Sequence, residues 1–370
     1  MHTTFDPHPD ALHNDPANPA LLDEAAVAAY EAQQFDQCDA LLQRREAVSP
    51  LTPPLLNLKG LCALATQRFD TASHAFEALS ATDTSFAVRY NLAYAKAMLG
   101  RFAETIALLD EPILAAMPAA SELKTRALYL GDRPDDAITL AARYADDPQV
   151  GEALRGLLAI ALFDRDGQGD ADRPTDRQAA RHYADRAAHS ADGLTARALL
   201  LLTDGLPDQA YVTFGDALAL SPEHSRAKLG IGLALLALAH GDAAAAQLDN
   251  AVKAFNHRAD LRVACGWAHL LAGERRSARA CFAHATQLDH ELAEAWGALA
   301  VFDWQDGKPE SARSAASRSW QLNPDNPALS LYDSLRLAVP SPDAMFSETF
   351  DARIKNVAGL WARHCARFRE

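Results

Sequence analysis

Small and apolar residues recur at a spacing of 34 residues along the second half of the chain. Five rows share one register, and each row keeps a small, apolar or helix-terminating residue type. The rows are Ala210, Ala244, Ala278 and Ala312; Phe214, Leu248, Phe282 and Ala316; Ala217, Ala251, Ala285 and Ser319; Pro222, Asn256, His290 and Pro324; and Gly205, Gly273 and Gly307. A register kept over several copies predicts equivalent structural units stacked on one another.

The residue types in these rows predict that each unit is a pair of antiparallel helices. Alanine suits the crossing of two helices, because axes separated by only ~8–10 Å leave little room for side chains. The glycine row, in which Ala239 replaces one glycine, falls between the two predicted helices. A left-handed backbone is least costly for glycine at such a helix end. Pro222 and Pro324 follow the second predicted helix and stop it.

The unit that ends at Pro324 carries the fullest set of repeated positions. They are Trp296, Leu299, Ala300, Gly307, Ala312, Ala316, Ser319 and Pro324. A large residue, a leucine and a small residue, followed by glycine, three small residues and proline in this order, resemble the tetratricopeptide repeat family, whose pattern has an aromatic residue at the position of Ala316. The resemblance implies an all-α fold: a right-handed α-solenoid of about eight stacked antiparallel helix pairs, with C-terminal capping helices.

The strictness of the repeat changes along the chain and predicts five segments. One unit also carries residues that resemble the Sel1-like relatives of the family, which have a longer turn: Gly169, Asp176, Ala180, Tyr183, Ala187 and Ala188. We expect a disordered arm over 1–18, irregular repeats over 19–150, a Sel1-like unit over 151–192 with an acidic insert at 164–176, regular repeats over 193–326, and a cap with a basic amphipathic helix over 327–370.

The last segment is predicted to contain two helices. Residues 327–338 resemble one more first helix, and 344–369 form an amphipathic helix. Its apolar stripe is Phe346, Phe350, Ile354, Val357, Trp361, Cys365 and Phe368, and its other face carries Arg353, Lys355, Arg363, Arg367 and Arg369. Three arrangements are open: capping of the last repeat, docking into the protein's own groove or onto a partner, and adsorption to a membrane surface.

Composition and charge restrict the classes of partner. Apolar residues make up 49% of the 370 residues, which supports a folded core. The net charge of −14 disfavours nucleic acid and anionic membranes, because like charges repel, and would suit a basic partner. The N-terminus lacks a secretory signal, and no apolar run is long enough to span a bilayer, so we expect a cytoplasmic protein.

No pattern in the sequence predicts a metal or cofactor. The five cysteines, Cys38, Cys62, Cys265, Cys281 and Cys365, match no zinc spacing, and we expect buried reduced thiols. The histidines form no His-Glu-x-x-His motif. The acidic residues Asp164, Asp166, Asp170 and Asp172 resemble part of a calcium loop, but Thr175 stands where the loop requires glutamate. The alternative for this insert is a solvated loop.

The chain is not expected to be an enzyme. It has no nucleophile elbow, phosphate loop or dinucleotide fingerprint, and no catalytic residue is assigned. We expect a protein–protein interaction scaffold or adaptor that binds an apolar helix or peptide. A dedicated chaperone or a docking subunit of a secretion, export or glycosyltransferase complex is the alternative. Oligomers are also possible, because self-association can cover an apolar groove.

The resemblance also implies where a partner would bind. In the tetratricopeptide family the first helix of each pair lines a concave surface, and the corresponding positions of this chain are apolar or aromatic. The predicted partner-binding residues are Leu61, Tyr90, Tyr94, Met98, Leu229, Leu233, Val263, Trp267, Val301 and Trp304. The alternative for each is packing against a neighbouring helix, because a shift of one position changes the exposed face.

Overall fold

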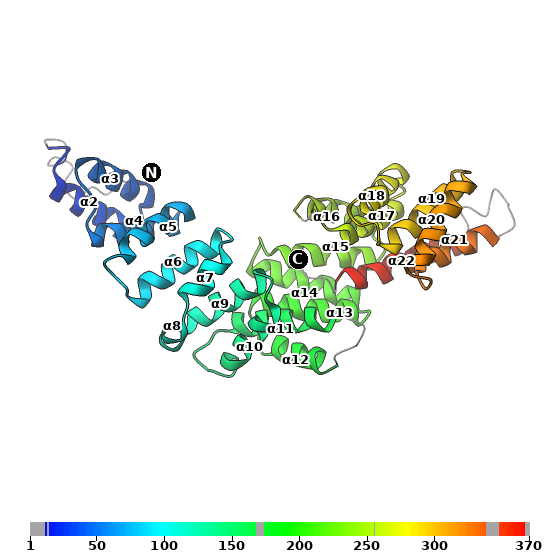
Figure 1. Ribbon diagram of the computed structural model, residues 1–370, viewed down its shortest axis with the longest axis horizontal. Helices are drawn as coiled ribbons and strands as arrows, with labels where there is room; N and C mark the ends of the chain where they lie inside the picture. The colour runs from blue at the N-terminus through cyan, green and yellow to red at the C-terminus, as the bar shows by residue number, and fades with distance from the viewer. Residues whose placement is uncertain (1–11, 13–14, 168–173, 255, 338–347, 367–370) are drawn as a thin grey trace. The chain divides into compact units, whose positions relative to one another are not determined.

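The computed structural model describes residues 12, 15–167, 174–254, 256–337 and 348–366, and in these residues every regular element is a helix. The chain divides into two compact units, Met1–Leu154 and Arg155–Glu370, and Figure 1 labels their helices. The predicted all-α class is confirmed for the described residues.

The first unit is built from helices that pair in chain order. They are α2 (Pro19–Glu31), α3 (Phe35–Val48), α4 (Pro53–Ala65), α5 (Phe69–Ser80), α6 (Phe86–Met98), α7 (Phe102–Leu108), α8 (Glu111–Ala116), α9 (Pro118–Leu130) and α10 (Pro134–Tyr144). Helices α2 and α3, α4 and α5, and α9 and α10 pack as pairs, while α5 contacts α6. In the pair that begins with α6, two short helices, α7 and α8, take the place of a single second helix, and Pro112 lies in the first turn of α8.

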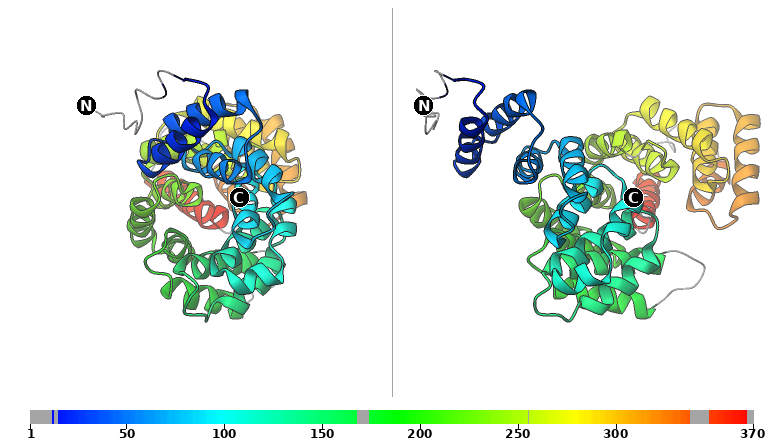
Figure 2. Two further views of the ribbon diagram at one scale, coloured as in Figure 1. Left: turned by 90° about the vertical axis from the view of Figure 1, so that its left-hand side faces the viewer. Right: turned by 60° about the vertical axis from the view of Figure 1, so that its left-hand side comes forward.

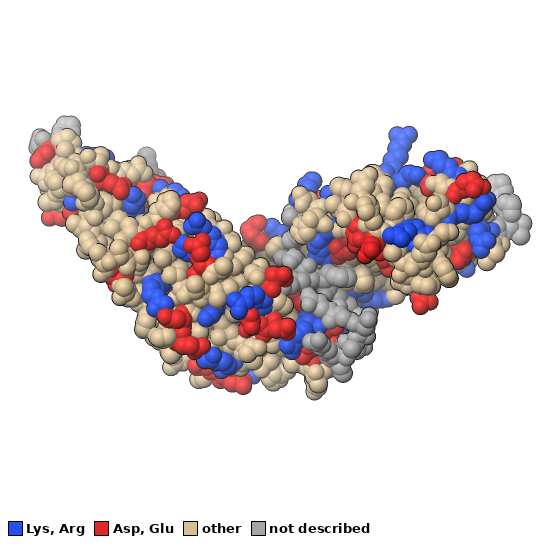
Figure 3. Space-filling model, in the orientation of Figure 1, with Lys and Arg blue, Asp and Glu red and all other residues tan. Residues whose placement is uncertain are grey.

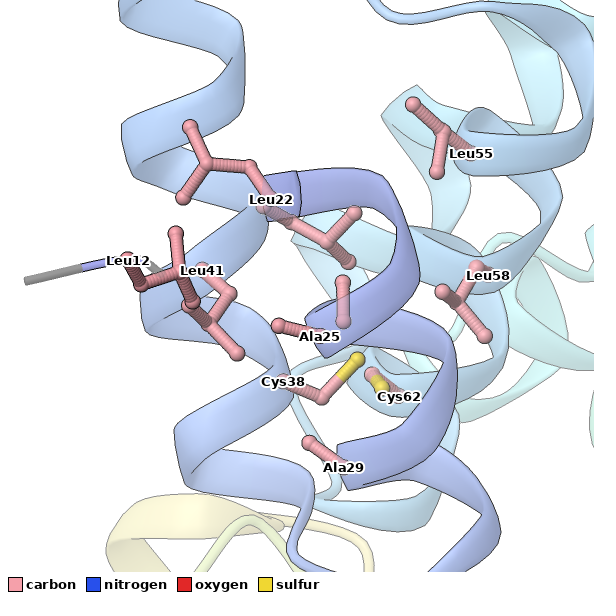
Figure 4. Packing of buried hydrophobic residues seen from close by; sticks show 11 residues of the cluster. Leu12, Leu22, Ala25, Ala29, Cys38, Leu41, Leu55, Leu58 and Cys62 are labelled. Atoms are coloured by element: carbon pink, nitrogen blue, oxygen red, sulfur yellow. The ribbon is translucent and has the colours of Figure 1, made fainter. Parts of the chain in front are cut away.

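Part of the predicted N-terminal arm is packed. Leu12 is buried against the cluster that contains Leu22, Leu41 and Cys38, which Figure 4 shows from close by. Asn18 caps α2, because its side-chain oxygen accepts hydrogen bonds from the first backbone N–H groups of the helix. The prediction of a disordered arm is therefore wrong at Leu12, and its residues 1–11 and 13–14 lie outside the described ones.

The second unit has two layers of helices. Its elements are α11 (Glu152–Gly167), which begins in the first unit, α12 (Pro174–Asp185), α13 (Ala191–Thr203), α14 (Pro207–Leu220), α15 (Ser225–Ala237), α16 (Gly241–Ala254), α17 (Ala259–Leu271), α18 (Arg275–Leu288), α19 (Ala293–Gln305), α20 (Pro309–Leu322), α21 (Pro327–Leu337) and α22 (Glu348–Cys365). The first helices α13, α15 and α17 contact one another in order, and so do α19 and α21. Each of α13, α15, α17 and α19 also packs on the second helix that follows it.

The repeated rows of the sequence form the interior of this unit. Ala210, Ala278, Ala312, Phe214 and Phe282 are fully buried. The small residues let paired helices approach, and the two phenyl rings fill the space beside Gly230 and Gly266, where any β-carbon would overlap them. The 34-residue period is therefore a packing period.

The turn between paired helices contains a residue with positive φ in every pair whose turn the structure describes. Gly205, Gly273 and Gly307 have φ of +80°, +78° and +71°, and Ala239 has +58°. The predicted glycine row and its alanine substitute are confirmed as left-handed turn residues. In the first unit the same turn is made by Gln33, Gln67, Gly100 and Asp132, which also have positive φ.

Replacing Ala239 by glycine is expected to stabilise the protein by about 0.5–1 kcal/mol, because glycine adopts this φ without the steric cost that a β-carbon brings. The reverse change, Gly273→Ala at the equivalent turn, is expected to destabilise it. Urea denaturation of both variants checks this pair. A change of stability in the same direction in both variants would contradict the equivalence of the two turns.

Candidate functional site

The C-terminal helix α22 lies on the layer of first helices in the second unit. It packs against α13, α15, α17 and α21, and is drawn in red in Figures 1 and 2. The surface that these four helices present to α22 is called here the first-helix groove. Of the three arrangements left open by the sequence, these contacts correspond to docking into the protein's own groove.

The apolar stripe of α22 faces the groove. Ile354, Val357, Trp361 and Cys365 are buried, whereas Arg353 and other charged residues of the helix lie at the surface. The helix is therefore amphipathic in the sense that the sequence predicts. Phe346 and Phe368 lie outside the described residues, as does the side chain of Phe350.

Polar contacts fix the C-terminal half of α22 in the groove. The indole Nε1–H of Trp361 donates a hydrogen bond to the backbone oxygen of Asp260 at 3.1 Å, in the first turn of α17. The thiol of Cys365 lies 3.5 Å from the same oxygen, and burial raises its pKa well above the usual value. Arg226 of α15 donates to the backbone oxygen of Ala366 at 3.4 Å. These contacts join the C-terminal end of α22 to α15 and α17.

Arg226 also forms a buried ion pair. Its guanidinium lies 2.7 Å from the carboxylate of Asp164 on α11, and the two side chains are 6% and 1% exposed. A buried charge is costly unless it is paired, so each of these residues requires the other. The pair holds Arg226 in the position from which it contacts the end of α22.

A small cavity lies beneath α22. Its volume is about 180 Å³, and it is bounded by Trp267, Glu294, Val357 and Trp361 among others. Burial raises the pKa of Glu294. The cavity is therefore mainly apolar, with one carboxyl group for which the neutral form is favoured relative to water.

The predicted partner-binding residues of the second unit are mostly covered. Leu229 and Leu233 on α15, Val263 and Trp267 on α17, and Val301 on α19 are buried. The first four belong to helices that α22 packs against, and Trp267 also stacks edge-on with Phe282 at 5.1 Å. These residues are thus covered within the folded unit, and Trp267 lies beside Val357 and Trp361 of α22 at the small cavity. A role for these residues in partner binding remains a prediction that requires α22 to leave.

Trp304 lines a second cavity and not the one beneath α22. It is half-buried, makes an edge contact with Tyr332 at 6.0 Å, and lines a cavity of about 700 Å³ with Trp320, Arg313 and Arg336. This cavity is formed by α19, α20 and α21. The structure therefore separates Trp304 from Trp267, which the sequence grouped on one surface.

The predicted residues of the first unit keep accessible surface. Tyr94 and Met98 on α6 are 37% and 50% exposed, and Tyr90 and Leu61 are half-buried. Burial raises the pKa of Tyr90. Tyr90, Tyr94 and Met98 follow one another at four-residue spacing, so they lie along one side of α6. They stay predicted partner contacts.

The acidic insert differs from both sequence interpretations where it is described. Helix α11 continues to Gly167 and α12 begins at Pro174, so Asp164, Asp166 and Asp176 are helical. Each is nearly buried and faces an arginine: Arg226, Arg177 and Arg165 respectively. They are therefore neither solvated nor arranged as a calcium loop, because the arginines already neutralise them. Asp170 and Asp172 lie outside the described residues.

One cluster of potential ligands was missed from the sequence. Cys265 and His269 on α17 and Cys281 on α18 place their ligand atoms within 4.8 Å of one another. The hydrogen bond with Cys281 raises the pKa of Cys265 and lowers that of Cys281. Burial lowers the pKa of His269, but hydrogen bonds to Asp249 and Glu274 outweigh it and leave that pKa raised.

Two signals in the sequence could have found this cluster. Cys265 and His269 are four residues apart, which places them on one face of a helix. Cys265 and Cys281 stand eight residues before and eight after Gly273, and residues equidistant from the turn of a helix hairpin lie side by side. This combination of sequence spacings is not among the known zinc-binding motifs.

The surface has no single charged region on the face that Figure 3 shows, where acidic and basic side chains are interspersed within each unit. Among the described residues, no helix combines the length and apolar character that crossing a membrane requires. Neither observation singles out a surface for nucleic acid or lipid.

Comparison with known proteins identifies the fold. No family model and no curated protein matches the sequence. A solved structure of a monomeric mutant of IFIT1 with m7Gppp-AAAA is 13% identical, covers 94% of this chain and 90% of its own, and has a TM-score of 0.50. The APC/C Cut9–Hcn1 complex is 13% identical over 93% of this chain and 79% of its own, with a TM-score of 0.42.

The C-terminal part of a TPR repeat-containing protein from Cytophaga hutchinsonii is 16% identical over 60% of this chain and 91% of its own, with a TM-score of 0.40. Identities this low bear on the fold alone. The paired helices, the left-handed turns and the buried rows, together with the likeness to the IFIT1 structure at a TM-score of 0.50, show that the chain is a helical-repeat protein with a tetratricopeptide-like, all-α fold.

Proposed function

We propose that the chain is a non-catalytic interaction scaffold that binds an apolar, amphipathic helix of a protein partner in the first-helix groove. The observation that carries this proposal is α22 itself. It is an amphipathic helix, it lies on α13, α15, α17 and α21, and it buries Ile354, Val357 and Trp361 there. A groove that accepts one such helix has the shape and polarity to accept another.

In this proposal α22 is the intramolecular occupant of the groove, and a partner helix competes with it. A tethered segment acts at an effective concentration in the millimolar range, so a partner must bind the free groove tightly to displace it. Trp361 is the main anchor, because it combines a large buried side chain with a hydrogen bond to Asp260. The net charge of −14 favours a partner that, like the exposed face of α22, is basic.

The side of α6 that carries Tyr90, Tyr94 and Met98 is proposed as a further partner contact in the first unit. It differs from the first-helix groove because Tyr94 and Met98 are already exposed. A partner could bind there without displacing any helix.

A labelled peptide of residues 348–366 tests the groove. We expect the full chain carrying Trp361→Ala to bind this peptide, because its own tail is weakly held. The unaltered chain is expected to bind it about 100-fold more weakly, since a tail docked with ~3 kcal/mol leaves about 1% of the grooves open. Fluorescence anisotropy of the peptide measures both affinities.

Asn356→Ala is the matched control, because Asn356 lies on the exposed face of α22. This variant should bind the peptide as weakly as the unaltered chain does. The proposal fails if the Trp361→Ala chain keeps its helical circular dichroism but does not bind the peptide. Equal binding by all three chains would show that the peptide binds elsewhere.

A further inference from the structure

Four side chains with metal-binding atoms converge between three helices of the second unit. Cys265 and His269 lie one turn apart on α17, Cys281 lies on α18, and Asp249 lies on α16. None of them lines the small cavity beneath α22. They come from consecutive helices, so a bond to each of them would connect one repeat to the next.

The distances within the cluster fit a single small ion. The ligand atoms of Cys265, His269 and Cys281 all lie within 4.8 Å of one another. The Oδ1 of Asp249 lies 3.1 Å from the Sγ of Cys265 and 3.1 Å from the Nε2 of His269. A tetrahedral zinc ion, with bonds of about 2.0–2.3 Å, spaces its ligand atoms by about 3.3–3.8 Å. Shifts of about 1 Å or less would bring the ligand atoms of Cys265, His269 and Cys281, and the distances from Asp249 to Cys265 and His269, to the tetrahedral values. Asp249 is not within 4.8 Å of all three of the other ligand atoms, so a tetrahedral set also requires it to move toward Cys281.

A second carboxylate orients the histidine. The Oε2 of Glu274 lies 2.8 Å from the Nδ1 of His269. An imidazole whose Nδ1–H donates to Glu274 presents the lone pair of its Nε2 to the cluster, which is the form that binds a metal. Metal-binding histidines usually have such a carboxylate partner. Glu274 is therefore a positioning residue.

Burial and charge are also suitable. Cys265 and His269 are buried, which shields the ligands from water, while Cys281 and Asp249 are half-buried and leave a path for an ion. Two thiolates and one carboxylate carry three negative charges, of which a divalent cation neutralises two. The positive charge of Arg262 acts on Cys281 and offsets the third.

The other cysteine pair has a different environment. Cys38 and Cys62 lie together in the first unit, where Figure 4 shows their sulfur atoms side by side. A carboxylate that acts on both of them, Asp39, forms an ion pair with Arg68 at 2.5 Å. Among the described residues, three or more ligand atoms come together at the Cys265 cluster and not at this pair. The pair therefore provides a matched control.

We propose that Asp249, Cys265, His269 and Cys281 form a tetrahedral binding site for one zinc-type divalent cation, which connects α16, α17 and α18. Two sulfur ligands, one nitrogen and one oxygen favour zinc over magnesium or calcium, which prefer oxygen ligands. All four positions are supplied by the protein, which is typical of a structural rather than a catalytic site.

The full chain, purified under reducing conditions and incubated with zinc, is expected to retain one zinc ion per chain after gel filtration, measured by inductively coupled plasma mass spectrometry. Cobalt(II) in place of zinc should give the visible absorption of a tetrahedral thiolate complex. Cys281→Ser and His269→Ala should lose stoichiometric binding, whereas Cys38→Ser should retain it. Glu274→Gln should weaken zinc affinity about 10–100-fold, as the loss of a carboxylate that orients a metal-binding histidine does.

Three results would overturn the proposal. The first is that the unaltered, reduced chain binds no zinc at stoichiometric concentration. The second is that Cys281→Ser binds as well as the unaltered chain. The third is the formation of a disulfide between Cys265 and Cys281 in the presence of zinc, detected by thiol labelling and mass spectrometry. The first result requires no substitution, so the test does not depend on whether a variant folds.

Discussion

Replacing Trp361 by alanine is expected to release α22 from the first-helix groove. The indole is 5% exposed and donates its N–H to the backbone oxygen of Asp260. Truncating a buried tryptophan costs about 3–5 kcal/mol, because apolar contacts are lost and a cavity remains. Here the loss would fall on the contact between α22 and α17, so the tail would detach before the repeats unfold.

Limited trypsin digestion measures this release. Arg353, Lys355 and Arg363 provide cleavage sites within α22, and cleavage of a transiently open segment follows the population of the open form. A loss of about 3 kcal/mol corresponds to roughly 100-fold faster removal of the tail. Asn356→Ala leaves these sites intact and should digest at the rate of the unaltered protein. Equal rates for both variants would contradict the anchoring role of Trp361.

Replacing Arg226 by alanine is expected to destabilise the second unit by about 3–5 kcal/mol, which is the usual cost of removing one partner of a buried ion pair. The partner that remains is the carboxylate of Asp164 on α11, whose side chain is 1% exposed. The contact from Arg226 to the backbone of Ala366 is lost as well, so the tail should also be digested faster.

Chemical denaturation followed by circular dichroism measures the change, and Lys228→Ala is the matched control. Lys228 lies two residues away on α15 and pairs with Glu223, but the two side chains are 45% and 91% exposed. An exposed pair contributes about 0–1 kcal/mol, so this variant should be close to the unaltered protein. Similar losses of unfolding free energy for both variants would show that the buried ion pair contributes no more to stability than the exposed one.

Much of the fold could be predicted from the sequence because its determinants are local. The row of glycines with Ala239 marks a turn that needs positive φ, and the rows of Ala210 and Phe214 mark side chains packed between helices. Both follow from constraints that act within one repeat or between neighbouring repeats.

The state of the groove could not be predicted from the sequence. Periodicity identifies Leu233, Val263 and Trp267 as apolar residues on first helices, but it does not say what covers them. The helices that carry these residues are contacted by α22, far along the chain, for example through the hydrogen bond between Trp361 and Asp260, which are 101 residues apart. The amphipathic pattern of a helix predicts that one face will be buried, and tertiary packing decides where.

The charged and ligating clusters depend on the same long-range pairing. Asp164 resembles a calcium ligand in the sequence and becomes the partner of Arg226, which is 62 residues away. Asp249, His269 and Cys281 match no known motif, because their proximity requires α16, α17 and α18 to be placed first. The residue types show which side chains can form ion pairs or bind a metal, whereas the stacking of the repeats decides which of these side chains lie close together.

Hydrogen exchange of the unaltered full chain, followed by mass spectrometry, tests most directly whether α22 occupies the first-helix groove. The account predicts that amides of residues 354–365 exchange about 100-fold more slowly than those of the free 348–366 peptide, because the buried face and the contacts at Asp260 and Ala366 hold the helix in place and leave about 1% of the grooves open. Exchange of these amides within seconds, while α15 and α17 stay protected, would contradict it.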